Sequence, residues 1–401
     1  MDATGSLLAH LECRSCCAQV DADRPVGICP TCGHALFATY RIDALDSGSW
    51  RADVSARAAT LWRYRELLPV RRIEEIVTLG EGFSPIVPLP EWDGSDVLEV
   101  SVKDDGGLPT GSFKARGMAV AVSRAHELGL RALFVPSAGN AGVALAAYGA
   151  RAKLRVRVFL PERTPRPMKD ACRLYGAEVV ELPGTLREVG TEARAREVSS
   201  GAFDMSTLRE PYRLEGKKTM GFEIFEQCAA DGLPDAILYP TGGGTGLVGM
   251  YKAFSELRAL GQLEKFPRLY SVQPEGCAPV VRALREDATK VTPWEDPRTI
   301  APGLLVPAPF ASERILEAVR ETHGGGVTVS DVEIVDAIRE LAHRFGVSAS
   351  PEGAAPYAAL PKLLRDGRVR SGERVLLYNT GTGLPFSLSE LERSVGSVAA
   401  G

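Results

Sequence analysis

The chain has 401 residues, of which 45% are hydrophobic, and its formal net charge at pH 7 is −4. This length and composition predict a soluble globular protein with two domains and a small appendage. The sequence has no basic run, so we exclude nucleic acid and anionic membranes as partners and expect a small-molecule ligand. The first ten residues do not have the character of a secretory signal, and no window approaches a membrane span, so we expect a cytoplasmic protein.

Four cysteines near the amino terminus form two pairs that have the spacing of zinc knuckles. The pairs are Cys13 with Cys16 and Cys29 with Cys32, and twelve residues separate them. Such pairs present four thiolates to one tetrahedral Zn²⁺, so we predict a structural zinc ribbon over residues 1–40. Cys17 competes with Cys16 as a ligand, and His34 is a weaker competitor. The alternative is a metal-free arm with reduced cysteines.

Beyond a helix-like stretch expected around residues 56–68, short apolar segments alternate with longer amphipathic ones. This alternation predicts an α/β fold with right-handed parallel crossovers. The expected strands cover residues 97–102, 132–135, 156–160, 178–182, 236–239, 269–273 and 375–378. We expect a large domain over residues 41–104 and 185–401, with a small domain over residues 105–184 inserted into it.

Lys114 stands in the run Gly111-Ser-Phe-Lys114, directly before an amphipathic segment at residues 115–128. The lysine is therefore expected near the start of a helix. The positive end of the helix dipole disfavours an ammonium group, which lowers the pKa of the amine and keeps it available for imine formation. The alternative is an ordinary surface lysine.

The strand expected at residues 132–135 runs into the turn Pro136-Ser-Ala-Gly-Asn-Ala-Gly142. A turn between a strand and a helix presents free backbone N–H groups, which can bind a carboxylate. Asn140 can also place its amide beside a cofactor oxygen. The alternative is that Asn140 only caps the helix.

A third loop, Thr241-Gly-Gly-Gly-Thr-Gly246, offers a nest of backbone N–H groups that only glycines allow a phosphate to approach closely. A lysine amine together with a phosphate cradle indicates pyridoxal phosphate (PLP), because its aldehyde condenses with the amine. Residues 244–249 and Glu275 also satisfy a dinucleotide fingerprint, so an NAD-dependent oxidoreductase is a competing hypothesis. That hypothesis leaves Lys114 without a role.

The strand expected at residues 375–378 leads to Asn379-Thr-Gly-Thr-Gly-Leu384. If the short, neutral Thr380 hydroxyl meets the pyridine nitrogen of PLP, that nitrogen is not forced into its protonated form. This arrangement suits eliminations better than transamination. The alternative is that Thr380 only caps a glycine-rich turn.

With these loops in order, the chain resembles threonine synthases and related PLP enzymes of fold type II. The motifs that carry the resemblance are 79–85, 109–114, 137–140, 210–219, 241–246, 351–355 and 380–384. The resemblance implies two open, twisted α/β domains with the cofactor in the cleft between them, preceded by a small zinc ribbon. It also implies a homodimer.

The resemblance assigns roles to individual positions. Lys114 would hold PLP covalently and move protons, and Thr380 would contact the ring nitrogen. The further implied cofactor contacts are Asn140, Gly242, Gly243, Gly244, Thr245 and Gly246. The implied substrate contacts are Ser137, Ala138, Gly139, Asn140 and Ala141 for the carboxylate, and Arg213, Arg116 and Lys218 for the phosphate.

The implied reaction is that of a carbon–oxygen lyase acting on phosphates: O-phospho-L-homoserine and water give L-threonine and phosphate. Two positions depart from the family pattern. Ala115 stands where many threonine synthases have Asp, and Pro385 stands where Lys is frequent. The alternative chemistry is a β-elimination or β-replacement on serine, phosphoserine or threonine, as in dehydratases and cysteate-synthase-like enzymes.

Overall fold

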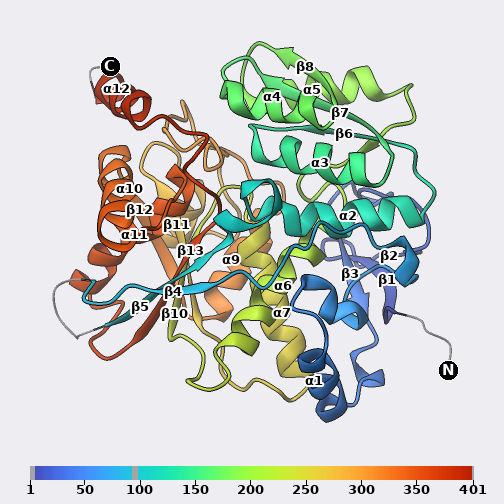
Figure 1. Cartoon of the computed structure of the whole chain (residues 1–401), viewed down its shortest axis with the longest axis horizontal. Helices are drawn as coiled ribbons and strands as arrows, with labels where there is room; N and C mark the ends of the chain where they lie inside the picture. Colours follow the sequence, from blue (N-terminus) through green and yellow to red (C-terminus); the bar gives the residue numbers. More distant parts are fainter. Residues whose placement is uncertain (1–4, 93–97, 400–401) are drawn as a thin grey trace.

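The computed structural model describes residues 5–92 and 98–399, which are arranged around three β-sheets (Figure 1). A three-stranded antiparallel sheet forms the amino-terminal ribbon, with the order β2-β1-β3. Its strands are β1 (Leu8–Cys13), β2 (Gln19–Val20) and β3 (Leu36–Tyr40). The ribbon lies beside helix α2, on the side of the molecule away from the large sheet.

The large sheet has six strands in the order β12-β11-β10-β13-β5-β4, and only β4 is antiparallel to its neighbour. The strands are β4 (Ile86–Pro88), β5 (Glu99–Asp104), β10 (Ala236–Pro240), β11 (Arg268–Pro274), β12 (Gly325–Val329) and β13 (Arg374–Asn379). The central strand β10 is buried along its whole length, as expected for a parallel sheet covered on both faces. The expected strands at 236–239, 269–273 and 375–378 are confirmed, and residue 97 of the strand expected at 97–102 lies outside the described residues.

Alternation along β10 explains how the large sheet is covered on both sides. Ile237 and Tyr239 belong to a core with residues of α6 and α7, whereas Ala236 and Leu238 belong to a second core with residues of α10 and α11. Successive side chains of a strand point to opposite faces, so one apolar run serves both cores.

The small sheet is parallel, with the order β8-β7-β6-β9. Its strands are β6 (Ala132–Pro136), β7 (Arg155–Pro161), β8 (Glu178–Leu182) and β9 (Phe203–Asp204). The three longer strands agree with the prediction. Strand β9 belongs to this sheet, and helix α5 packs against its strands β6 and β7. Both elements lie beyond residue 184, where we expected the small domain to end. The unit therefore extends past that boundary.

Twelve α-helices surround these sheets in the described part of the chain. They are α1 (Ser47–Ala56), α2 (Lys114–Glu127), α3 (Asn140–Arg151), α4 (Arg166–Leu174), α5 (Leu186–Glu197), α6 (Tyr212–Gln227), α7 (Thr245–Ala259), α8 (Pro279–Arg285), α9 (Ser312–Glu321), α10 (Asp331–Phe345), α11 (Pro351–Arg365) and α12 (Leu388–Ala399). Among the described residues, we find no helix that combines the length and apolar character needed to cross a membrane.

The helix-like stretch expected at residues 56–68 is not an α-helix. Helix α1 ends at Ala56, and a 3₁₀ segment, η2 (Leu61–Leu67), follows. The Arg63 guanidinium donates to the backbone oxygens of Val54 and Ser55, at 2.6 and 3.0 Å. This side chain caps the last turn of α1 and so ends the helix.

Strand β12 was missed because its sequence begins with two glycines. A Cβ atom on the preceding residue, Gly324, would lie 1.9 Å from the backbone oxygen of Leu269 in β11. Gly324 therefore allows β12 to approach β11 closely. This packing overrides the low strand propensity of the two glycines that begin β12.

Candidate active site

A cavity of about 590 Å³ lies where β6, β10 and β13 end, and it is lined by residues from both the small and the large sheet regions. Openings at the carboxyl ends of parallel strands are the usual ligand sites of open α/β sheets. Thirteen of the predicted site residues line it, namely Lys114, Ser137, Ala138, Gly139, Asn140, Ala141, Arg213, Gly242, Gly243, Gly244, Thr245, Gly246 and Thr380.

Lys114 is the first residue of α2, and its amine lies 4.2 Å from the centre of the Phe113 ring. Burial lowers the pKa of Lys114 to about 7, and the nearby positive charge of Arg213 adds to the effect. The predicted lowering is therefore present, but its main cause is burial rather than the helix dipole. Near neutral pH much of this amine is unprotonated and can act as a nucleophile or base.

The glycine loop at residues 242–246 forms a tight cradle at the start of α7. Gly244 has a φ of 75°, in the left-handed region, and precedes the first helical residue. A Cβ on Gly242 would lie 2.2 Å from the Gly303 oxygen, and one on Gly246 would lie 1.9 Å from the Tyr239 hydroxyl. Only glycines fit here, and the first N–H groups of the helix have no intrahelical partner. These groups can bind a phosphate.

The turn after β6 is held by the Ser137 hydroxyl, which accepts hydrogen bonds from the backbone of Gly139 at 3.0 Å and Gly142 at 2.9 Å. Gly139 is the N-cap residue of α3. Asn140 therefore does not cap the helix, and its amide has no side-chain hydrogen bond within the described residues. The amide is free to meet a ligand in the cavity.

Thr380 follows β13 and is tied to the lysine loop through the backbone. Its carbonyl oxygen accepts a hydrogen bond from the Phe113 N–H at 2.9 Å, and the adjacent Gly381 pairs with Ser112. Lys114 and Thr380 thus lie on two chain segments that are bonded to each other. Thr380 belongs to the cavity lining.

Arg213 reaches the cavity from the first turn of α6, and its guanidinium also donates to the Met205 oxygen at 2.6 Å. The buried Glu210 carboxylate accepts hydrogen bonds from the backbone N–H groups of Tyr212 and Arg213, at 2.9 and 2.7 Å. Burial raises the pKa of Glu210 to about 7. This carboxylate caps α6 and fixes the turn from which Arg213 projects.

Sequence reasoning missed three further arginines in the lining, Arg187, Arg194 and Arg209. Burial and the neighbouring Arg209 lower the pKa of Arg194. No motif marks these residues, although Arg187 and Arg194 are seven positions apart and so share one face of α5. Glu352, also missed, lines the cavity and accepts a hydrogen bond from the Gly303 N–H at 2.7 Å. The motif at residues 351–355 was recognised in the sequence, but no role was assigned to Glu352.

Arg116 and Lys218 do not line the cavity, so the expectation that they bind the substrate phosphate is corrected. Arg116 is fully buried and paired with Asp105 and Glu223, with an Nη2 to Oδ1 distance of 2.8 Å to Asp105. Lys218 is also fully buried, and its amine lies 2.7 Å from the carboxylate of Glu215. Their charges are already neutralised inside the protein.

The residues present fit PLP and not a dinucleotide. The cavity combines a lysine of lowered pKa with a glycine cradle that a Cβ atom would fill. Glu275, the expected ribose-binding acid, is not in the lining and lies 3.6 Å from the Lys362 amine. A Cβ on Gly249 would lie 3.0 Å from the backbone of Lys217, so this glycine serves the packing of α7 on α6.

The predicted cysteine ligands meet in the ribbon. The sulfur atoms of Cys13, Cys16, Cys29 and Cys32 all lie within 4.8 Å of one another. Cys13 is 3.4 Å from Cys32, and Cys16 is 3.6 Å from Cys29. Neither Cys17 nor His34 belongs to this group of ligand atoms in the described part of the chain.

Residues 77–381 match the model of a family described as pyridoxal-phosphate dependent enzyme. The chain is 35% identical to the threonine synthase of Methanosarcina acetivorans, in an alignment that covers 93% of this chain and 91% of the relative. It is 33% identical to the threonine synthase of Methanocaldococcus jannaschii, with 93% and 92% covered.

Solved structures share the architecture. The T.th. threonine deaminase matches with a TM-score of 0.63 and 29% identity, covering 76% of this chain and 94% of that one. The diaminopropionate ammonia lyase of Escherichia coli matches with a TM-score of 0.67 and 16% identity, covering 81% and 91%. The second match shows the fold alone.

Proposed function

This chain belongs to the pyridoxal-phosphate-dependent enzyme family, and we propose that it converts O-phospho-L-homoserine and water to L-threonine and phosphate. It has the mixed α/β architecture of fold type II and is a PLP-dependent lyase. The relatives that support the reaction are threonine synthases aligned over most of both chains. Related folds also carry deaminases and ammonia lyases, so the choice of substrate needs an argument from the cavity.

The charge of the cavity is the observation that carries the choice. Its lining contains Arg187, Arg194, Arg209 and Arg213 together with Lys114, against the single carboxylate of Glu352. Arginine forks bind phosphate oxygens in bidentate fashion. Arg194 and Arg209 repel each other, and a phosphate dianion between them would relieve that repulsion. Neither threonine nor serine offers a group that needs this excess of cations. Between the two phosphorylated substrates, the threonine synthase relatives favour O-phospho-L-homoserine over phosphoserine.

In the proposed site, Lys114 would hold the cofactor aldehyde and the glycine loop would hold its phosphate. Thr380 would contact the ring nitrogen and Asn140 the ring hydroxyl, and the turn at residues 137–141 would bind the substrate carboxylate. When bound, PLP supplies an electron sink for the negative charge that develops at the substrate Cα. These positions agree with the cavity lining.

The protein's own part in the reaction is proton transfer and binding of the substrate phosphate. The Lys114 amine takes the proton from Cα, and a second proton leaves Cβ as the γ-phosphate departs. Arg194, Arg209 and Arg213 bind the substrate phosphate and hold it in place. One of these two protons then goes to Cγ, which becomes the methyl group of threonine. Water adds its oxygen and one hydrogen at Cβ, its other proton goes to the released phosphate, and Lys114 returns the remaining proton to Cα.

We expect the PLP-loaded protein to release phosphate from O-phospho-L-homoserine and to form threonine in equal amount. Arg209→Gln and Arg194→Gln should each raise KM by roughly 10-fold or more, because each removes a charge-assisted hydrogen bond worth about 1.5–3 kcal/mol. Steady-state kinetics with product analysis provides the measurement.

Arg166→Gln is the matched control, because the Arg166 side chain is 90% exposed and lies outside the cavity lining. Its KM should equal that of the wild type. Ammonia release from threonine or serine, without phosphate release from phosphohomoserine, would assign the protein to the alternative chemistry.

We further propose that the four clustered cysteines hold one structural zinc ion. Thiolates at about 2.3 Å from a tetrahedral Zn²⁺ lie about 3.8 Å from one another. The Cys13–Cys32 and Cys16–Cys29 sulfur separations of 3.4 and 3.6 Å are close to this sulfur–sulfur distance. Four sulfur ligands leave no open position for a substrate, so the metal would stabilise the ribbon.

Purified protein should contain one zinc ion per chain by elemental analysis. Cys29→Ser should remove the metal, because one of four ligands is lost, whereas Cys17→Ser should retain it. The Cys17 variant is a matched control on the same ribbon. Metal-free wild-type protein, or equal zinc loss in both variants, would contradict the site.

The remaining proposals rest on the resemblance. We propose a cytoplasmic homodimer that acts on a small phosphorylated amino acid. We also propose three units: a ribbon over residues 1–40, a large domain over 41–104 and the carboxyl-terminal part, and a small inserted domain. In this proposal the inserted domain ends after residue 204 and not at residue 184, a choice supported by the pairing of β9 with β6.

A further inference from the structure

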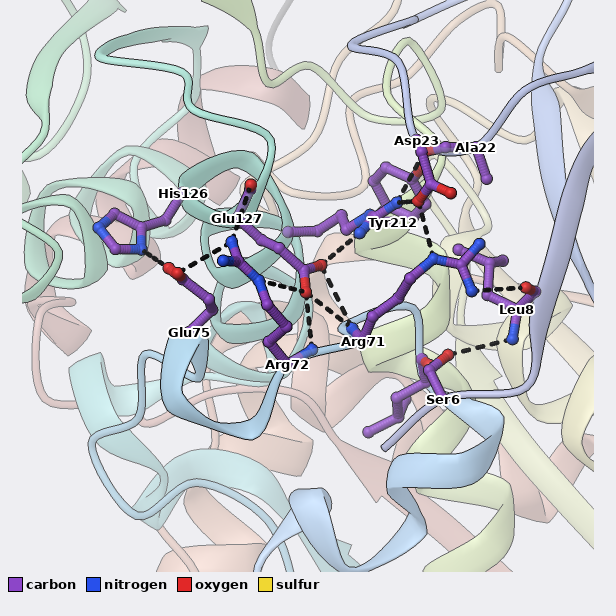
Figure 2. Close-up of polar contacts among 12 residues, drawn as sticks. Ser6, Leu8, Ala22, Asp23, Arg71, Arg72, Glu75, His126, Glu127 and Tyr212 are labelled. Atoms are coloured by element: carbon purple, nitrogen blue, oxygen red, sulfur yellow. Dashed lines mark hydrogen bonds and ion pairs between the residues drawn. The ribbon is translucent and has the colours of Figure 1, made fainter. Parts of the chain in front are cut away.

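The ribbon docks on the rest of the protein through the loop that contains Ala22 and Asp23 (Figure 2). The buried Tyr212 hydroxyl donates to the Ala22 oxygen at 2.9 Å, and the Arg124 guanidinium donates to the same oxygen at 2.8 Å. Asp23 accepts hydrogen bonds from Arg124 at 2.6 Å and from Arg71 at 2.7 Å. One loop of the ribbon thus joins α2, α6 and the segment after η2.

A second contact brings the ribbon backbone against Arg209. A Cβ atom on Gly27 would lie only 2.6 Å from the Arg209 carbonyl oxygen. Backbone atoms of the ribbon and of the segment before α6 therefore touch directly, and any side chain at position 27 would push this segment away. The ring of Phe203, in β9, lies next to the same glycine.

The two contacts bracket a short stretch, residues 209–213, which we call the arginine segment. It carries Arg209 and Arg213, and both line the cavity. Gly27 touches the start of this segment, and Ala22 is bonded to Tyr212, next to its end. Inside the segment, Glu210 ties the backbone of residues 212 and 213 into a turn. The segment is short and rigid, so displacement at either contact moves both guanidinium groups.

We propose that the ribbon is a positioning element of the substrate pocket, which acts through Gly27 and Tyr212 on Arg209 and Arg213. This inference rests on the proposed role of the two arginines in phosphate binding. Phosphate recognition by arginine guanidinium groups depends on geometry, so a displaced guanidinium binds the substrate phosphate less tightly. The ribbon then has a function in substrate binding without contributing any atom to the cavity.

Gly27→Ala and Tyr212→Phe test the proposal from the two ends of the segment. We expect Gly27→Ala to raise KM for O-phospho-L-homoserine about tenfold with little change in kcat, as for the loss of roughly one charge-assisted hydrogen bond to the phosphate. Tyr212→Phe should give a smaller rise, because Arg124 still bonds to the Ala22 oxygen. Backbone amides of residues 205–213 should exchange hydrogen faster in both variants. The visible absorbance and the zinc content should stay unchanged.

Glu75→Gln is the matched control. Glu75 belongs to the group of polar contacts drawn in Figure 2, where it pairs with Arg72 and His126, and it forms no ion pair with the described residues of the ribbon. Unchanged KM in both test variants would overturn the proposal, as would a loss of kcat together with cofactor loss. If Gly27→Ala fails to fold, Tyr212→Phe decides alone. If the wild type does not turn over phosphohomoserine, the proposed function fails, and the exchange rates of residues 205–213 still decide whether the ribbon holds the segment.

Discussion

Lys114→Ala is expected to reduce kcat by at least about 1,000-fold, because general-base catalysis alone contributes roughly 100- to 10,000-fold. The same change should abolish the covalent attachment of PLP, which borohydride reduction followed by peptide mapping detects. The fold should be retained, since the lysine faces a cavity and its amine forms no ion pair within the described residues. Circular dichroism and thermal unfolding check this point.

The pH dependence of attachment follows from the lowered pKa of Lys114. In the folded apoprotein the amine loses its proton around pH 7, whereas in the unfolded chain it does so near its ordinary value of 10.5. Between pH 7 and pH 10.5 the unfolded chain binds more protons than the folded apoprotein does. The free energy of unfolding therefore rises with pH over this range, and this contribution is lost as the pH falls toward 7. The rate of PLP attachment should be constant above about pH 8 and fall tenfold per unit well below pH 7.

Two other lysines serve as controls for this result. Lys290 is exposed, and Lys290→Ala should change neither turnover nor attachment. Lys217 is the structural competitor: its amine donates to the Phe113 oxygen and lies 3.8 Å from the Phe113 ring centre. Burial and the charge of Lys114 hold the pKa of Lys217 well below its usual range. Lys217 is outside the cavity lining, so reduced cofactor found on Lys217 in the wild type would contradict the assignment.

The predicted site residues that line the cavity stand in loops whose shape depends on local backbone geometry. The glycine cradle was predictable because Gly244 needs a positive φ and the loop joins a buried strand to a helix. The turn after β6 was predictable for a similar reason, although Ser137 and not Asn140 supplies the capping oxygen. In both loops, residue type and position between two elements determine the arrangement of N–H groups.

The parts that were wrong or missed depend on which face a helix turns to the cavity. Arg116 comes two positions after Lys114 in α2, which places it about 200° around the helix and away from the cavity. Two residues that stand close together in a sequence motif therefore need not lie close together in the folded protein. Arg194 and Arg209 were missed because they belong to no motif. They approach each other only in the folded protein, where α5 packs on the small sheet and the segment before α6 leaves the β9 strand of that sheet.

Arg116 is the centre of a buried charge network, which gives a second large expected effect. Its guanidinium is bonded to Asp105 at 2.8 Å and to Glu223, whose carboxylate also lies 3.0 Å from the Lys103 amine. All four side chains are fully buried. The Tyr378 hydroxyl donates to the Asp105 carboxylate at 3.0 Å, so the network joins α2, α6 and two strands of the large sheet.

Arg116→Met should therefore destabilise the protein by roughly 3–5 kcal/mol, because it leaves two carboxylates buried against a single lysine. For a chain of this size, the loss corresponds to a fall in Tm of roughly 4–6 °C. Arg116→Lys should be less destabilising, because lysine keeps the positive charge and loses only the paired hydrogen bonds of the planar guanidinium. Thermal unfolding of the two variants beside Arg166→Gln provides the comparison.

The same variants separate a structural role from a substrate-binding role. A residue that held the substrate phosphate would raise KM and leave Tm near that of the wild type. Arg116→Lys is expected to do the reverse: a lower Tm, with KM for phosphohomoserine close to the wild-type value in the fraction that remains folded. An unchanged Tm combined with a raised KM would return Arg116 to the substrate site and would require the α2 helix to turn a different face to the cavity.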